Sequence, residues 1–294
     1  MKFDLHCHST CSDGTYAPAD VVQRAHAAGV DVLALTDHDT LLGIDEARAA
    51  ATAYGMTLIN GVEISCEHTL NGGYGKNKST NKIIHVLGLD FTDREKMHET
   101  LLQLQESRAT RGQRITEKLS KLLDIDYDEL WQAVLDKAGG NPQAVGRAHI
   151  GQVLFERGEV KTVQKAFDKY LADNKSAYVA IDALSMADGI ELIHACGGKA
   201  VLAHPTRYQL SATRVRKLIE EFAQLGGDAC ELPATSEPIS TRKMVDRSIA
   251  EHELVASIGS DFHGSNMPWR RLGDVPSLTT EQLGVWQLFE NTSY

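Results

Sequence analysis

The stretch APADVVQRAHAAGVDVLALTDHDT, residues 17–40, joins a helical pattern to an apolar run that ends in charged side chains. Pro18 stands where a first helical turn tolerates proline, and Gly29 stands where helices commonly end. The run over residues 30–39 is rich in Val and Leu, which is typical of a buried parallel strand with an exposed polar tip. A helix followed by such a strand indicates an α/β fold with a parallel sheet or barrel.

The same alternation continues on both sides of this stretch. We expect seven strands, over residues 3–9, 30–39, 56–65, 82–90, 199–205, 228–233 and 254–263. Helices are expected over residues 17–29, 42–54, 186–196, 212–225 and 240–252, with a short C-terminal helix over 282–289. The loop over residues 71–81 is rich in Gly, Lys and Asn and is expected to be mobile.

The pattern changes near Asp93, where a mostly helical region begins. Residues 101–123, LLQLQESRATRGQRITEKLSKLL, have heptad-like spacing, and no strong strand run follows until about Asp173. We therefore predict a helical insertion subdomain over residues 94–177, between a first part (1–93) and a second part (178–294) of the sheet or barrel.

Composition excludes several classes of protein. The formal net charge of −10 disfavours sequence-independent binding to long duplex nucleic acid, where phosphate contacts dominate. No stretch is apolar enough for a membrane span, and the N-terminus lacks the pattern of a secretory signal. Five scattered cysteines favour a reduced, cytoplasmic protein over one held by disulfides.

Imidazoles and carboxylates gather at the ends of the expected strands. In β/α folds these ends meet at one edge, where functional residues collect. Residues two apart on a strand share a face, which pairs His6 with His8 and Asp261 with His263 and lets Asp4 orient an imidazole. The strand ends and the fourth strand carry His6, His8, Asp13, Asp37, His38, Asp39, Glu63, His85, His204, Glu231, Asp261 and His263.

This donor set predicts a metal centre with more than one ion. Imidazole and carboxylate ligands suit Mn²⁺, Zn²⁺ or Fe²⁺. Any single element, such as HxH on a strand, has an incidental explanation, but independent accidents at successive strand ends are improbable. Cys7 and Cys11 lack a second pair of cysteines, so we expect Cys7 to pack in the wall and Cys11 to have no role.

These motifs, in their order, resemble those of the PHP (polymerase and histidinol phosphatase) family. The matching segments are DLHCHSTCSDG, ALTDHDT, NGVEIS, IIHVLG, VLAHP and GSDFH. The resemblance covers nearly the whole chain and implies a distorted, TIM-like (β/α)7 barrel with a di- or trinuclear metal centre that hydrolyses phosphoesters. The insertion resembles that of the bacterial 3′,5′-nucleoside bisphosphate phosphatase and RNase AM subgroup.

By that resemblance, Glu63 would bridge ions, and Asp13, His38 and His263 would also touch the substrate. Two or three divalent ions are implied, with Mn²⁺ expected. Three features depart from the subgroup: Thr206 replaces a common Gly, DNKSAYV lacks a Gly-Lys, and the 71–81 loop is longer. The metal-centre residues carried over are His6, His8, Asp13, His38, Glu63, His85, His204, Asp261 and His263.

The implied reaction removes the 3′-phosphate of a nucleoside 3′,5′-bisphosphate, such as adenosine 3′,5′-bisphosphate, and trims short single-stranded RNA from its 5′ end. A hydroxide that bridges two ions is the expected nucleophile. His263 or Asp261 would protonate the leaving oxygen, and Asp13 and His38 complete the expected catalytic set. A second phosphate needs its own cations, and the candidates are Arg147, His149, Lys175 and Arg207.

Two other functions remain open from the sequence. One is a different PHP phosphatase, such as one acting on histidinol phosphate, although a small monoester needs no second phosphate site. The other is an inactive PHP module with a regulatory role, although such a module need not retain a complete ligand set. A substrate assay with added metal separates all three.

Overall fold

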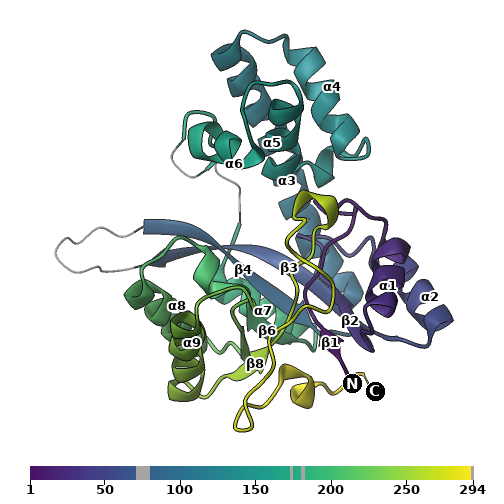
Figure 1. Cartoon of the computed structure of the whole chain (residues 1–294), viewed down its shortest axis with the longest axis vertical. Helices are drawn as coiled ribbons and strands as arrows, with labels where there is room; N and C mark the ends of the chain where they lie inside the picture. Colours follow the sequence, from purple (N-terminus) through teal and green to yellow (C-terminus); the bar gives the residue numbers. More distant parts are fainter. Residues whose placement is uncertain (71–79, 173–174, 180–182, 293–294) are drawn as a thin grey trace.

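The chain forms two lobes in a computed structural model, which describes residues 1–70, 80–172, 175–179 and 183–292 (Figure 1). The larger lobe surrounds a sheet, with helices α1 and α2 beside one part of it and α8 and α9 beside another. The smaller lobe is helical and stands above the sheet. Within the described residues, no helix is long and apolar enough to cross a membrane.

The sheet runs in the order β1-β2-β3-β4-β6-β7-β8, and β5 pairs with β3 outside this path. The amide of Leu5 donates to the carbonyl of Ile258 at 3.0 Å, and Cys7 forms a parallel bridge with Phe262, so the two ends of the path meet. The seven described strands of the path therefore curl into the expected barrel. Their bounds are β1 Phe3–Asp4, β2 Val32–Leu35, β3 Thr57–Leu70, β4 Thr80–Leu89, β6 Lys199–Leu202, β7 Ala229–Glu231 and β8 Val255–Ser257, with β5 at Leu184–Ser185.

The barrel is distorted because β4 runs antiparallel to both β3 and β6. The expectation of a wholly parallel sheet is therefore wrong at this strand. A parallel pair needs a crossover of a dozen or more residues, and too few residues join β3 to β4 for one. The loop expected to be mobile, 71–81, lies outside the described residues except at its last two positions.

The helices of the larger lobe follow the expected pattern closely. They are α1 Pro18–Ala27, α2 Ile44–Tyr54, α7 Met186–Ala195, α8 Ala212–Gln224 and α9 Ile239–Glu251. Each buries an apolar stripe against the sheet; in α8 the stripe is Val215, Leu218, Ile219 and Phe222. The C-terminal helix expected over residues 282–289 is instead a short 3₁₀ turn over Val285–Leu288, too short to continue as an α-helix.

The smaller lobe is built by α3 Arg94–Leu123, α4 Tyr127–Lys137, α5 Arg147–Glu156 and α6 Val163–Ala166. Asp93 caps the start of α3 by accepting from the amide of Lys96 at 3.0 Å. Met97 and Leu101 of α3 pack in the core of the sheet, whereas Ile115 and Leu119 pack in a second, helical core. One long helix thus connects the two lobes, and the subdomain bounds at residues 94 and 177 stay a prediction.

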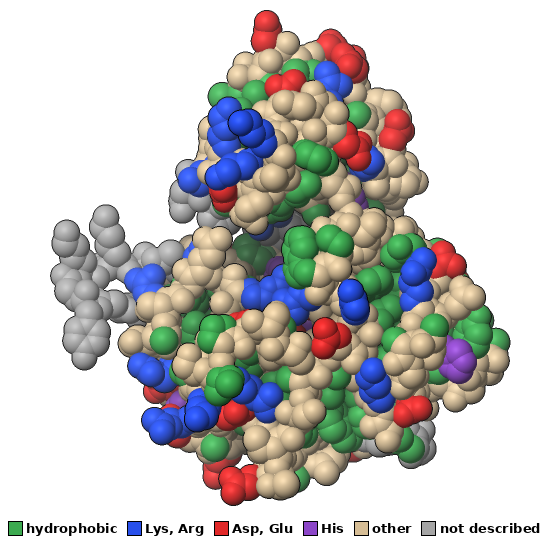
Figure 2. Space-filling model, viewed as in Figure 1, with side chains coloured by type: hydrophobic (Ala, Val, Ile, Leu, Met, Phe, Trp, Pro, Cys, Tyr) green, Lys and Arg blue, Asp and Glu red, His purple; other side chains and the backbone are tan. Residues whose placement is uncertain are grey.

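The two lobes also meet through α5. A Cβ atom on Gly146, at the start of α5, would lie 3.6 Å from the Cβ of Asp13. Gln152 of α5 hydrogen-bonds Asn266 in the segment after β8. The start of α5 therefore lies over the edge of the barrel where the expected functional residues gather, beside the hollow seen between the lobes in Figure 2.

Candidate metal centre

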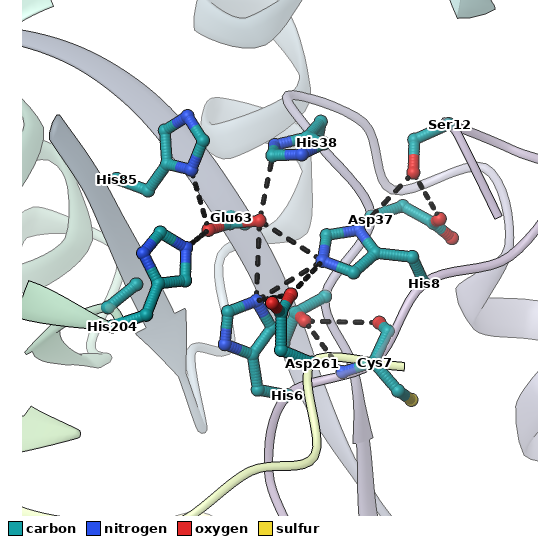
Figure 3. Close-up of polar contacts among 12 residues, drawn as sticks. His6, Cys7, His8, Ser12, Asp37, His38, Glu63, His85, His204 and Asp261 are labelled. Carbon is teal, nitrogen blue, oxygen red and sulfur yellow. Dashed lines mark hydrogen bonds and ion pairs between the residues drawn. The ribbon is translucent and has the colours of Figure 1, made fainter. Parts of the chain in front are cut away.

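The carboxylate of Glu63, on β3, lies at the centre of a cluster of imidazoles (Figure 3). The side chain of Glu63 is 1% exposed, so the surrounding groups and not water must balance its charge. Its Oε2 atom lies near one nitrogen of each of three rings, and its Oε1 atom lies near two more. The distances are 3.3 Å to His6, 3.1 Å to His8 and 3.2 Å to His38 from Oε2, and 2.9 Å to His85 and 3.0 Å to His204 from Oε1.

His6 and His8 follow β1 and point to the same side, as the alternation along a strand predicts. Their Nε2 atoms are 3.2 Å apart, and neither side chain is exposed. Nδ1 of His6 lies 2.7 Å from Oε2 of Glu231, the acceptor for an Nδ1 proton, which turns the Nε2 lone pair toward the cluster. Gly259 allows this packing, because a Cβ there would lie 2.2 Å from the Cβ of His6.

Asp261 and His263 approach the same pair of histidines from the segment after β8. Oδ1 of Asp261 lies 3.3 Å from Nε2 of His6 and 3.5 Å from Nε2 of His8. Asp261 has a φ of 51°, an uncommon conformation for a residue other than glycine, and such backbone strain clusters at functional sites. His204, another member of the cluster, shares this feature with a φ of 27°.

Asp13, His38 and His263 form the outer side of the cluster. Oδ1 of Asp13 lies 3.2 Å from Nε2 of His263, and its Oδ2 lies 3.8 Å from Nε2 of His38. Nδ1 of His263 donates to the backbone carbonyl of Asp261 at 3.0 Å, since a carbonyl only accepts. A neutral His263 therefore has a lone pair, and no proton, on the Nε2 atom that faces Asp13.

The donor atoms fit divalent ions in both number and chemistry. Four groups of three or four donors have ligand atoms within 4.8 Å of one another, and together they contain all nine residues expected at the metal centre. Several of these buried atoms have no hydrogen bond within the described protein, which is costly unless something else binds them. They are Asp13 Oδ1, Glu63 Oε2, His38 Nδ1, His85 Nδ1 and His204 Nδ1.

The electrostatics of the cluster lower the pKa values of the Glu63 and Asp13 carboxyls and of the His38, His204 and His263 rings. Burial raises the pKa of Glu63, but the imidazoles of His38, His85 and His6 outweigh it and hold that pKa well below its usual value. Burial lowers the pKa of His204 to about 4 and also lowers that of His38. Anionic carboxylates and neutral imidazoles are the forms that bind metal ions.

His6 is the exception among the rings. Burial lowers its pKa, but the carboxylates of Glu231 and Glu63 raise it to about 10. When a metal cation replaces the Nε2 proton of His6, the same two carboxylates would make this nitrogen a stronger ligand. His6 is therefore a fully buried histidine whose positive charge two carboxylates stabilise.

Neighbouring carboxylates have other roles than the sequence suggested. Asp4 was expected to orient an imidazole, but it accepts from the amides of Ser260 and Gly273 at 2.8 Å each, so that prediction is wrong. Asp37 accepts from Ser9 and Ser12 and shapes the loop after β1, while Asp39 accepts from Ser65. These carboxylates are completed by hydrogen bonds inside the protein, which suits a structural role.

Glu231 performs the orienting role that we assigned to Asp4. Its position at the end of β7 indicated that Glu231 lies near the cluster. Spacing in the sequence does not show whether Asp4 or Glu231 reaches the ring of His6. The cysteines take no part: Cys7 is buried, its thiol lies 3.3 Å from the carbonyl of Ala34, and Cys11 is a free, half-buried thiol.

The four candidates for a second phosphate site lie in different surroundings. Arg207 forms an ion pair with Asp261 and is therefore directly beside the cluster. His149 is buried at the start of α5, with Nδ1 3.1 Å from the amide of Gly146. Arg147 is half-buried and donates to the carbonyl of Leu171 at 3.2 Å, whereas Lys175 is exposed.

The cluster opens toward one side. The side chains of His6 and His8 are fully buried, whereas those of His85 and Asp13 are 23% and 17% exposed. The side of Asp13 and His85, where Gly146 at the start of α5 lies close to Asp13, is therefore the more exposed side of the cluster.

Known proteins are similar to this chain in sequence and in fold. The PHP domain family matches residues 4–183. A protein of Haemophilus influenzae named 5′-3′ exoribonuclease is 40% identical over 98% of this chain and 99% of its own length. A 3′,5′-nucleoside bisphosphate phosphatase of Chromobacterium violaceum is 32% identical over 98% of this chain and 96% of its own. A solved amidohydrolase structure from the same organism, with bound sulfate, has a TM-score of 0.85 at 30% identity and covers 98% of this chain and 96% of that one.

Proposed function

The chain belongs to the PHP domain family, and from that premise we propose that it removes the 3′-phosphate of nucleoside 3′,5′-bisphosphates and trims short 5′-phosphorylated RNA from the 5′ end. The chain is a hydrolase that acts on phosphoester bonds. The observation that carries the proposal is the cluster around Glu63, which brings together nine metal-binding side chains. One relative named for each of these two activities supports the choice of substrates.

Divalent ions, when bound, supply an activated water and neutralise charge on the phosphoryl group. We expect Mn²⁺, with Zn²⁺ or Fe²⁺ as alternatives, held by the nine clustered residues. Glu63 belongs to two of the four donor groups, which suits a bridging carboxylate. Asp13 and His38 lie on the open side and are proposed to contact the phosphate that reacts.

The hydrogen bond of His263 bears on the choice of proton donor. Because its Nδ1 proton is given to the carbonyl of Asp261, a neutral His263 has no proton on Nε2 to pass to a leaving oxygen. Asp261 is then the better candidate, since its carboxylate lies between the histidine pair and Arg207. We propose that the charged Asp261 first accepts a proton released by the attacking water and then passes it to the leaving oxygen, and that His263 binds metal and substrate.

A second phosphate distinguishes the bisphosphate from simple esters. Arg207 is proposed to bind it with a forked pair of N–H donors, supported by Arg147, His149 and Lys175 from the smaller lobe. We predict that Arg207→Ala lowers kcat/KM about tenfold or more on the bisphosphate, the worth of one charged hydrogen bond, and far less on an aryl phosphate. Equal losses on both substrates would contradict this role.

The proposal is tested by a substrate panel with Mn²⁺ present. It contains adenosine 3′,5′-bisphosphate, histidinol phosphate and a short 5′-phosphorylated RNA. Release of the 3′-phosphate from the first, with RNA shortened from its 5′ end, supports the proposal. Preference for histidinol phosphate would assign a different PHP phosphatase, and no hydrolysis with any divalent ion would indicate an inactive module.

A further inference from the structure

We propose that Tyr208 is a positioning residue of the metal centre: its hydroxyl bridges β4 and β6 and thereby holds two of the clustered histidines in place. Those histidines are His85 of β4 and His204 after β6, which both contact Glu63. The inference rests on the proposed function, because it concerns side chains that would hold the ions. Tyr208 lies directly after the 3₁₀ turn Pro205–Arg207, which follows β6.

The hydroxyl of Tyr208 takes the place of one hydrogen bond between the two strands. The antiparallel register of β4 and β6 brings His85 opposite Ala203, one position beyond the last pair of the ladder. Residues opposite each other at such a position exchange two hydrogen bonds, and one of them forms: the amide of Ala203 donates to the carbonyl of His85 at 3.1 Å. In place of the other, the amide of His85 donates to the Tyr208 hydroxyl at 2.8 Å, and that hydroxyl donates to the carbonyl of Ala203 at 3.0 Å.

This bridge fixes the backbone at two expected metal ligands. His85 supplies one end of the bridge, and His204 directly follows Ala203 at the other end. The two rings approach the same oxygen of Glu63, with Nδ1 of His85 at 2.9 Å and Nε2 of His204 at 3.0 Å from Oε1 (Figure 3). The φ of 27° at His204 is a sparsely populated conformation, which persists only when the surrounding structure holds it. The bridge holds the residue directly before it.

The ring of Tyr208 packs beside both imidazoles. Its centroid lies 5.3 Å from that of His204 and 6.3 Å from that of His85, and its plane is nearly perpendicular to the ring of His85, at 85°. Such separations are typical of interacting aromatic pairs. The contacts limit the rotation of both imidazoles, so the ring and the hydroxyl act on the same two ligands. Phenylalanine keeps the ring and lacks the hydroxyl, and therefore separates the two contributions.

Loss of the hydroxyl should move both ligands. The amide of His85 and the carbonyl of Ala203 would lose their partner, which is costly for buried groups, unless the strands close to form the direct bond. Closure would shift the backbone of His85 and His204 relative to Glu63. These two histidines belong to different groups of metal-binding donors that share Glu63. We therefore expect weaker binding of ions by both groups.

The test is a calorimetric titration of the metal-free protein with Mn²⁺, for wild type, Tyr208→Phe and Tyr208→Ala. We expect Tyr208→Phe to raise the Kd for Mn²⁺ about 10–100-fold, the usual effect of losing a group that orients a ligand, and Tyr208→Ala to raise it further. The visible absorption of bound Co²⁺, which reports ligand geometry, should change in both variants, and the activity of Tyr208→Phe should recover at high Mn²⁺. Tyr54→Phe, at an exposed tyrosine of α2, is the matched control and should behave as wild type.

An unchanged Mn²⁺ affinity and Co²⁺ spectrum in Tyr208→Phe would overturn the inference, even with a lower melting temperature, because Tyr208 would then only stabilise the fold. A loss of affinity in Tyr208→Ala but not in Tyr208→Phe would show that the ring alone acts, which contradicts the bridge. If the variants do not fold, slow deuterium exchange of the His85 amide in the wild type supports the bridge, and fast exchange contradicts it. A wild type that binds Mn²⁺ but hydrolyses none of the proposed substrates would overturn the proposed function, and the titration would still decide the role of Tyr208.

Discussion

Carboxylates are buried at both ends of the barrel, but hydrogen bonds within the protein satisfy both oxygens of Asp90 at one end and not both oxygens of Glu63 at the other. Asp90 follows β4, which runs opposite to its neighbours and so ends at the edge where β3 and β6 begin. Its Oδ2 accepts from the amides of Glu290 and Asn291 at 2.9 Å, and its Oδ1 accepts from Thr292. Glu63, in the cluster on the same sheet, is almost fully buried, yet its Oε2 has no hydrogen bond of good geometry within the described protein.

The difference separates structural charge from functional charge. Asp90 is completed by the chain itself, so folding alone satisfies its oxygens. Glu63 is surrounded by imidazole nitrogens, and not all of these nitrogens carry a proton to donate to it. Metal cations can bind the carboxylate and the imidazole lone pairs together. Substitutions at the metal-centre end should therefore reduce chemistry and metal binding, whereas substitutions at the opposite end should reduce stability.

The largest effect is expected for Glu63→Gln. An amide keeps the shape of the side chain but removes the charge that we propose to bridge ions. We predict a loss of kcat of about a thousandfold, the scale on which single electrostatic stabilisers act. The phosphatase assay with Mn²⁺ measures it, and circular dichroism confirms that the variant is folded. Activity within a few-fold of wild type would show that the charge of Glu63 is not needed at the metal centre.

Glu231→Gln should have an intermediate effect. Glu231 accepts a proton of His6 and touches no other ring of the cluster within hydrogen-bonding distance, so it acts through that ligand. Loss of such an outer partner typically weakens metal affinity about 10–100-fold. We expect activity to fall at low Mn²⁺ and to recover at high Mn²⁺. A loss that added metal does not restore would show that Glu231 acts in some other way.

The smallest effect on activity is expected for Asp90→Asn. The amide oxygen of the new side chain can still accept from the amides of Glu290 and Asn291, but its NH2 group replaces the acceptor of the Thr292 hydroxyl and the charge that strengthens all three hydrogen bonds is lost. We predict a loss of about 1–3 kcal/mol in the free energy of unfolding. Urea denaturation measures this loss, with the exposed Asp136→Asn as the matched control. Unchanged stability, or a clear loss of kcat, would show that the two ends are not distinct in the proposed way.

Much of the fold could be predicted because apolar runs and turn residues mark its elements. The bounds of α1, α2, α8 and α9 lie within a few residues of those expected. The direction of β4 could not be predicted in the same way, because the pattern of side chains along a strand is the same in both directions. Only the absence of an intervening helix hinted at the antiparallel pairing.

The strand-end rule brought most of the residues proposed for the metal centre to one edge, and the resemblance to the PHP family narrowed that set to nine. His85, on the antiparallel β4, still reaches Glu63, because it lies inside the strand beside β3 and not at a strand end. Contacts between distant segments could not be predicted from spacing. Glu231 reaches His6 across 225 positions of the chain.

The most direct test of the central claim is the metal content of purified protein by elemental analysis, for wild type, Glu63→Gln and Asp90→Asn side by side. We expect two or three divalent ions per wild-type chain, the same number in Asp90→Asn, and a loss of ions in Glu63→Gln. Equal metal content in wild type and Glu63→Gln, or no metal bound to the wild type after incubation with Mn²⁺, Zn²⁺ or Fe²⁺, would contradict it.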